Sequence, residues 1–255
     1  MKKEVQLSPV VGTVISLIDS WIAEASNWFE WDDLGSNSKI YKCNGGNTEF
    51  YLQVDDNFTT YCKVKLWESW NNETHAGSGA VTPFKCMFKS TDYYRCIGDN
   101  KYICVYDYQS TSQITLFYAG YITPLLSEDT KAIYITGNNT TSSGDSLCFC
   151  NNQSLGSFLF SFSGGLPVAD WSLHAYITDP SMFTINNQSL VLFYVYLGEY
   201  QSNKKVRGFV PNIFGVGPNP PSGLTAGDNI YIGDTPYQLV RKSSSPYNVI
   251  FIKNA

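Results

Sequence analysis

Residues able to carry chemistry are sparse in this sequence. Its 255 residues include two histidines, His75 and His174, and seven cysteines. Either histidine could in principle act as a base for a cysteine nucleophile. However, His75 lies in a polar stretch and His174 in an alternating strand pattern, where solvated or hydrogen-bonded structural histidines are more common. We therefore predict no catalytic residue at either position.

Motifs of the common enzyme classes are also missing from the sequence. There is no serine-nucleophile motif, phosphate-binding glycine loop or HExxH helix. Glycoside hydrolysis needs a pair of carboxylates, and the candidates by residue type are Asp32-Asp33, Asp55-Asp56, Glu68 and Glu73. Adjacent aspartates are more typical of turns. A cell-wall hydrolase is therefore the least favoured of the functions considered.

The cysteines are best interpreted as buried thiols. Their odd number argues against a complete disulfide framework. Cys148 and Cys150 are two residues apart, so in a strand they would share a face. With two histidines in the chain, the remaining ligands of a metal site are hard to supply. We expect no metal and no cofactor.

A polar segment over residues 68–82 is the best candidate for a contact site. It contains Asn71-Asn72 and Gly77-Ser78-Gly79, which predict a long loop, and such loops in compact domains are usually functional or mobile. The possible interface or ligand residues are Trp67, Trp70, Asn71, Asn72 and His75. The two tryptophans could stack on sugar rings, although aromatic residues in a β-rich chain are usually core.

Composition narrows the possible partners. Charged residues make up 15% of the chain, aromatic residues 15%, and the net charge is −5. Few charges imply a surface of uncharged polar groups, as in proteins that mainly face other proteins. The basic clusters are too short for the extended positive surface that binds nucleic acid. No apolar run approaches the roughly 18 residues of a membrane helix, nor is there an unbroken apolar leader, so we expect synthesis in the cytosol.

One helix is predicted near the start. After Ser8-Pro9, apolar residues recur at steps of four and three, which predicts an amphipathic helix of about five turns. Its face would comprise Val11, Ile15, Ile18, Ile22, Ala25 and Phe29, and the segment 32–37 would end it. Beyond it the hydrophobic period changes to two, which is typical of strands.

The strands predict an α+β fold with predominantly antiparallel sheet. The clearest ones cover residues 48–54, 61–67, 101–108, 113–121 and 190–196, followed by a closing meander over 229–253. We expect the N-terminal amphipathic helix to pack on a sheet, followed by a β-sandwich-like lobe. An Asn-, Thr- and Ser-rich segment suggests lobes over residues 1–137 and 138–255, with a single domain as the alternative.

Two stretches resemble a family of tailed-bacteriophage virion proteins. They are Gly98-Asp99-Asn100-Lys101-Tyr102-Ile103-Cys104-Val105-Tyr106 and Tyr118-Ala119-Gly120-Tyr121-Ile122-Thr123-Pro124. The helix-first opening and the ending over residues 224–237 are also similar to that family. After Pro124 the chain departs from it, with Leu-Leu-Ser-Glu-Asp in place of a proline- and tyrosine-rich stretch. The resemblance implies a structural protein of the tail, baseplate or neck, with no catalytic residue to carry over.

Three functions follow in order of preference. A virion structural subunit would contact other virion proteins and copies of itself, most simply in a symmetric ring. A receptor- or glycan-binding module of a tail fibre, tip or head fibre would expose Trp67 or Trp70 on a concave face. A cell-wall hydrolase would bring two carboxylates together in a cleft.

Overall fold

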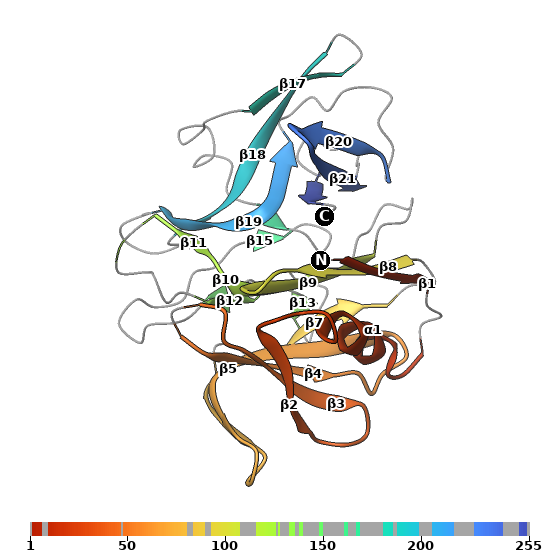
Figure 1. Ribbon diagram of the computed structural model, residues 1–255, viewed down its shortest axis with the longest axis vertical. Helices are drawn as coiled ribbons and strands as arrows, with labels where there is room; N and C mark the ends of the chain where they lie inside the picture. Colours follow the sequence, from red (N-terminus) through yellow and green to blue (C-terminus); the bar gives the residue numbers. More distant parts are fainter. Residues whose placement is uncertain are drawn as a thin grey trace.

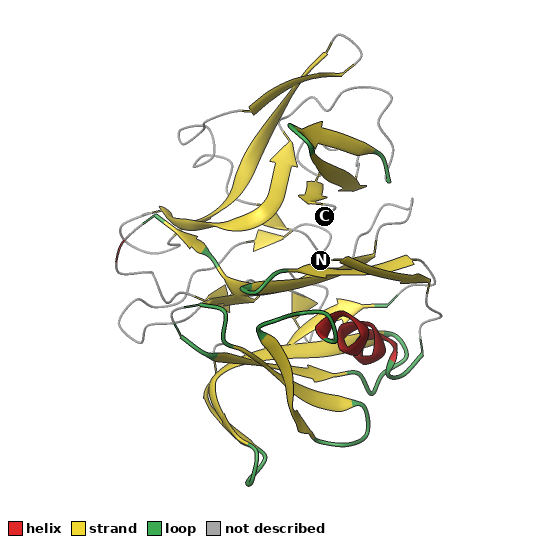
Figure 2. Ribbon diagram, in the orientation of Figure 1, coloured by secondary structure: helices red, strands yellow, loops and turns green. Residues whose placement is uncertain are grey.

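Three large antiparallel sheets, one two-stranded sheet and one helix form the regular structure in the part of the chain that is described (Figures 1 and 2). The structure is a computed structural model. It describes residues 2–6, 10–46, 48–80, 84–89, 93–107, 116–125, 127, 133–135, 138–139, 148–149, 161–162, 167–168, 181–185, 188–198, 206–216, 227–241 and 250–253. The strand pattern predicted around His174 lies outside these residues. The prediction of a β-rich α+β fold with the helix on a sheet is confirmed.

The first sheet holds the candidate contact segment. Its strands run in the order β13-β7-β5-β4-β3-β2, with β6 beside the distal half of β5. Their bounds are β2 Trp28–Asp33, β3 Ser38–Cys43, β4 Phe50–Asp55, β5 Tyr61–Asn71, β6 Ala76–Ala80, β7 Lys85–Phe88 and β13 Asn138–Asn139. The predicted alternation holds in β4 and β5, where Leu52, Val54, Cys62 and Val64 are buried.

The second sheet follows the order β1-β8-β9-β10-β12-β14. Its strands are β1 Lys2–Gln6, β8 Tyr93–Gly98, β9 Tyr102–Asp107, β10 Leu116–Tyr121, β12 Ile133–Ile135 and β14 Cys148–Phe149. A turn at residues 99–101 joins β8 to β9, and β9 and β10, which correspond to the strands predicted at 101–108 and 113–121, pair antiparallel. Strand β1, which pairs with β8 at the sheet edge, was not predicted.

A third sheet is built mainly from the C-terminal part of the chain. It follows the order β17-β18-β19-β22-β21-β20, and β11 pairs with β19. The bounds are β11 Thr123–Pro124, β17 Ser181–Ile185, β18 Gln188–Gly198, β19 Val206–Val216, β20 Asn229–Ile232, β21 Thr235–Arg241 and β22 Ile250–Lys253. A separate two-stranded pair joins β15 Ser161–Phe162 to β16 Pro167–Val168.

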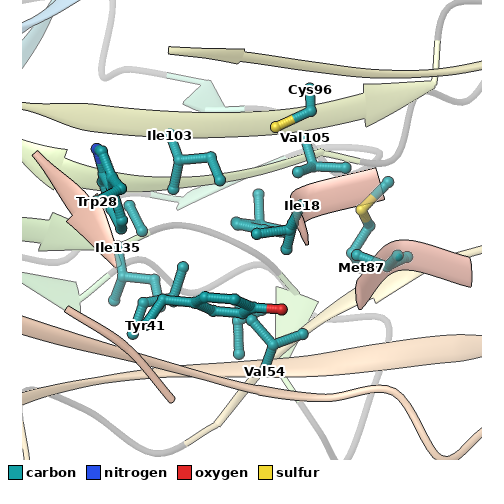
Figure 3. Close-up of a cluster of buried hydrophobic side chains, with 14 of the residues drawn as sticks. Ile18, Trp28, Tyr41, Val54, Met87, Cys96, Ile103, Val105 and Ile135 are labelled. Carbon is teal, nitrogen blue, oxygen red and sulfur yellow. The ribbon is translucent and has the colours of Figure 1, made fainter. Parts of the chain in front are cut away.

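The main core lies between the first two sheets and the helix α1, Thr13–Ile22 (Figure 3). Ile18 of α1, Val54 of the first sheet and Ile103 of the second are each fully buried in it. Alternate residues on β9 face opposite ways, so Tyr102 and Tyr106 lie on the other side of the second sheet. There Asn212 of β19 donates to the Tyr102 hydroxyl at 3.0 Å. The second sheet is thus buried on both faces.

The predicted five-turn helix is too long. Helix α1 ends at Ile22, and residues 28–33 form β2 instead of its last turns. Trp28 is 1% exposed and Phe29 44%, the alternation of a strand with one face on the core. The aromatic run Trp-Phe-Glu-Trp favours sheet, and pairing with β3 overrides the helical spacing that the same residues offer.

A buried ion pair holds the start of α1. Asp56 follows β4 and is 0% exposed; its Oδ2 accepts hydrogen bonds from the backbone N–H groups of Val14 (2.8 Å) and Ile15 (3.4 Å). Its Oδ1 pairs with the Lys89 ammonium. Lys89 Nζ also donates to the carbonyls of Val10 (2.8 Å) and Phe58 (2.7 Å). Asp56 therefore caps a helix more than 40 residues away rather than merely forming the predicted turn.

Candidate functional site

The predicted long loop at 68–82 is instead largely a β-hairpin. Strand β5 continues to Asn71, a four-residue turn follows, and β6 returns along it with Trp67 opposite Ala80 and Ser69 opposite Ser78. The polar and glycine residues of this segment suggested a loop. However, the antiparallel pairing of β5 with β6 continues through them. Figures 1 and 2 show the hairpin projecting beyond the rest of the first sheet.

The hairpin turn is closed by its own side chains. The Asn71 side-chain oxygen accepts hydrogen bonds from the backbone N–H groups of Glu73 (2.8 Å) and Thr74 (3.1 Å). His75 ends the turn in the left-handed region, with φ 50°. Asparagine and histidine tolerate these roles better than most residues. Every residue from 71 to 76 is exposed, Asn72 included.

Two tryptophans fix the base of the hairpin. Trp67 and Trp70 meet edge to face, with ring centroids 5.7 Å apart. Trp70 is 9% exposed and joins Ile40 and Tyr51 in a small second core on the outer face of the first sheet. Gly77 lies beneath both rings, because a Cβ there would stand 2.5 Å from Trp67 and 2.7 Å from Trp70. The tryptophans therefore serve mainly to anchor the hairpin.

Asp32 connects this base to strand β2. Its Oδ2 accepts the Trp70 indole N–H at 2.8 Å and lies 2.8 Å from Nδ1 of His75. Burial by itself would raise the pKa of Asp32, but hydrogen bonds from Trp70 and His75 outweigh it, so the pKa is lowered from its usual value. Asp32 thus stays ionised as an acceptor for both groups.

The geometry brings some predicted residues together and separates others. Trp67 contacts Trp70, and the Trp70 and His75 side chains both reach Asp32, whereas Asn72 stays exposed in the turn. The sequence offered Asp32 only as a carboxylate by residue type and did not place it at the hairpin, because nothing local connects it to residues some 40 positions away. A paired histidine and aspartate can hold a proton in place, but catalysis would need a nucleophile or metal as well. In the described part of the chain, no three His, Cys, Asp or Glu residues gather as metal ligands do.

An aromatic and cationic stripe runs along the outer face of β5. It consists of Tyr61, Lys63, Lys65 and Trp67, the residues that alternate with the buried Cys62, Val64 and Leu66. Lys63 Nζ lies 4.7 Å from the Phe58 ring centroid, and Lys65 Nζ lies 4.0 Å from that of Trp67. Burial lowers the pKa of Lys65. The alternation of residues 61–67 predicted this strand, but not that its lysines would lie over aromatic rings.

The cysteines that the structure describes with their surroundings are buried and form no disulfide, as expected: Cys43, Cys62, Cys86, Cys96 and Cys104. Burial raises the pKa of the Cys43 thiol to about 12. A thiol held protonated in this way is a poor nucleophile.

The fold and these contacts define a β-rich α+β protein with an anchored hairpin. No protein-family model matches the chain, and no curated protein matches it. Within the described residues, no helix has the length and apolar character needed to cross a membrane.

Proposed function

We propose that this protein is a non-enzymatic structural subunit of a tailed-phage virion, placed in the tail, baseplate or neck. In this role it contacts copies of itself, in a symmetric ring, and other virion proteins. The sequence strings around residues 98–106 and 118–124 are what connect it to virions. Subunits of an assembly are held by non-covalent contacts. The contacts at the base of the β5–β6 hairpin are of this kind and serve to hold the hairpin in place.

The observation that supports assembly most directly is the β5–β6 hairpin. Its tip over residues 71–76 is exposed, while its base is fixed by the Trp70 and His75 contacts with Asp32. A projecting element with a fixed base loses little conformational entropy when it binds a neighbour. This combination suits a contact arm between subunits better than it suits a freely moving loop.

Sugar stacking on the two tryptophans is less well supported. Trp70 is 9% exposed, and its indole N–H already bonds to Asp32. The Trp67 N–H donates to Gln53 at 2.9 Å, and Lys65 lies over the Trp67 ring. A platform for sugars would need at least one open aromatic face, so we place the receptor- or glycan-binding module second.

Two measurements test the proposal. Mass spectrometry of purified particles should detect the chain at a stoichiometry that fits a symmetric ring; its absence from particles would overturn the proposal. A variant with residues 71–76 replaced by Asn-Gly, a sequence suited to a two-residue hairpin turn, should fold but fail to enter particles. The matched control, Asn72→Ser, alters an exposed residue of the turn and should enter normally. Normal entry of the shortened variant would exclude the hairpin as the contact arm.

A further inference from the structure

Lys65 carries a charge that no carboxylate in the described part of the chain compensates. No carboxylate of the described residues lies within 4.0 Å of its ammonium, whereas Lys42 on the same sheet pairs with Glu49 at 2.8 Å. Lys65 Nζ is 4.0 Å from the Trp67 ring centroid and 5.2 Å from that of Phe84. Aromatic faces stabilise a cation only in part, so a half-buried ammonium in this setting still favours an anion.

Gln53 supplies a second donor beside it. Gln53 stands opposite Lys65 in the pairing of β4 with β5. An indole N–H can only donate, so its 2.9 Å contact with Gln53 fixes the amide oxygen toward Trp67. This orientation leaves the two amide N–H donors for another acceptor. An ammonium and an amide side by side match the two oxygens of a carboxylate.

A complementary group projects from the third sheet. Tyr231 on the edge strand β20 is 61% exposed, the most of any large hydrophobic residue in the described chain. The turn that follows places Gly233 at φ 57° and leaves Asp234 exposed. Residues 231–234 therefore carry an exposed aromatic ring and an exposed carboxylate three positions apart in the sequence. Figure 1 shows β20 and β5 at opposite ends of the molecule.

We propose that Lys65 and Gln53 bind the Asp234 carboxylate of a second copy of this chain, with Tyr231 of that copy against the aromatic stripe. Local complementarity favours a second copy as the occupant, because the exposed ring of Tyr231 and the exposed carboxylate of Asp234 match the aromatic rings and the cation around Lys65 on another copy. The inference rests on the proposed function and specifies one of its contacts. Since different surfaces meet, the contact is heterologous and generates a ring if the rotation closes, or a filament if it does not.

Charge reversal on the full-length chain tests this contact, with self-association followed by light scattering after size exclusion. Lys65→Glu and Asp234→Lys should each raise the dissociation constant at least about tenfold. An equal mixture of the two variants should recover wild-type association, because the reversed charges then face each other at every contact. Lys101→Glu makes the same charge change at an exposed lysine between β8 and β9 and should have no such effect.

Several results would overturn the contact. They are a wild-type chain that stays monomeric, an unchanged dissociation constant in both variants, no recovery in the mixture, or an equal effect of the Lys101 control. Binding of oligogalacturonate at Lys65 without self-association would assign the site to acidic sugars instead. Lys65→Met, which keeps the stem over Trp67, guards against misfolding and should weaken association less than Lys65→Glu. If the charge-reversal variants associate like the wild type and the wild-type chain is still found in particles, this contact is excluded but the proposed function is not.

Discussion

Replacing Asp56 by asparagine tests the buried charge pair that anchors helix α1. The amide oxygen of asparagine can still accept the Val14 N–H, so the helix cap survives. What is lost is the negative charge beside Lys89, whose ammonium would stay buried among neutral acceptors. The substitution therefore isolates the charge from the cap.

The expected loss is large because neither side chain reaches water. Asp56 is 0% exposed and the Lys89 side chain 1%. Removing one partner of such a pair costs about 3–5 kcal/mol of unfolding free energy. For a chain of this size, each kcal/mol lowers the melting temperature by roughly 2–4 °C, so Asp56→Asn should melt roughly 6–20 °C below the wild type.

Lys89→Met should differ from Asp56→Asn in its pH dependence. Burial raises the pKa of Asp56 above its unfolded value, so the folded state binds this proton more tightly. The resulting stabilisation is fully present below the unfolded pKa and is lost as pH rises through the folded pKa. Without Lys89, the carboxyl group can become neutral in acid. The stability deficit of Lys89→Met should therefore shrink at mildly acidic pH, while that of Asp56→Asn should not.

Urea unfolding of the two single variants and the double variant, at neutral and mildly acidic pH, gives the coupling energy. The double variant should be clearly more stable than the sum of the single losses predicts, because it contains no lone buried charge. An Asp56→Asn variant within about 1 kcal/mol of the wild type, or strictly additive losses, would refute the reasoning.

Three further predictions concern the hairpin and β2. Gly77→Ala should lower the unfolding free energy by about 1–3 kcal/mol and speed hydrogen exchange in β6, because the new methyl group must displace two indole rings. The lowered pKa of Asp32 stabilises the fold above its unfolded pKa, and this is lost as pH falls through the folded pKa. Because the Trp70 indole bonds to Asp32, we expect Trp70 fluorescence to change as Asp32 is protonated in acid. Asp32→Asn should remove this acid-dependent change. Trp28→Ala should cost about 3–5 kcal/mol and Phe29→Ala under about 1 kcal/mol in urea unfolding, since one side chain is buried and its neighbour half exposed.

Sequence patterns predicted the elements whose pairing is local. Strands β9 and β10 follow each other as predicted runs and pair antiparallel, and β4 and β5 alternate clearly. Each of these contacts joins residues close in sequence, so periodicity and turn chemistry are enough to identify them. The class of fold followed from the same signals, together with the apolar face of the first helix.

Long-range pairing accounts for most of what the sequence could not predict. Trp28 fits the helical face of α1 as well as a strand, and only the neighbouring β3 decides between them. Asp32 and Asp56 look alike as turn aspartates. One binds an indole 38 residues away and the other caps a helix 42 residues away. A local sequence pattern cannot predict such contacts, because they depend on which strands become neighbours in the fold.

Lys89 and Lys65 show how a lysine that stabilises the fold can be distinguished from one that is available to a binding partner. Lys89 has three acceptors for its three protons, one of them ionised, so its burial is fully compensated within the fold. Lys65 is shielded by aromatic rings but has no carboxylate of its own among the described residues. The fold thus compensates the buried Lys89 completely, whereas the half-buried Lys65 lies where a partner can supply the missing charge. For that reason Lys65, rather than the histidine and tryptophans of the hairpin, is the residue at which we expect association to be most sensitive to charge.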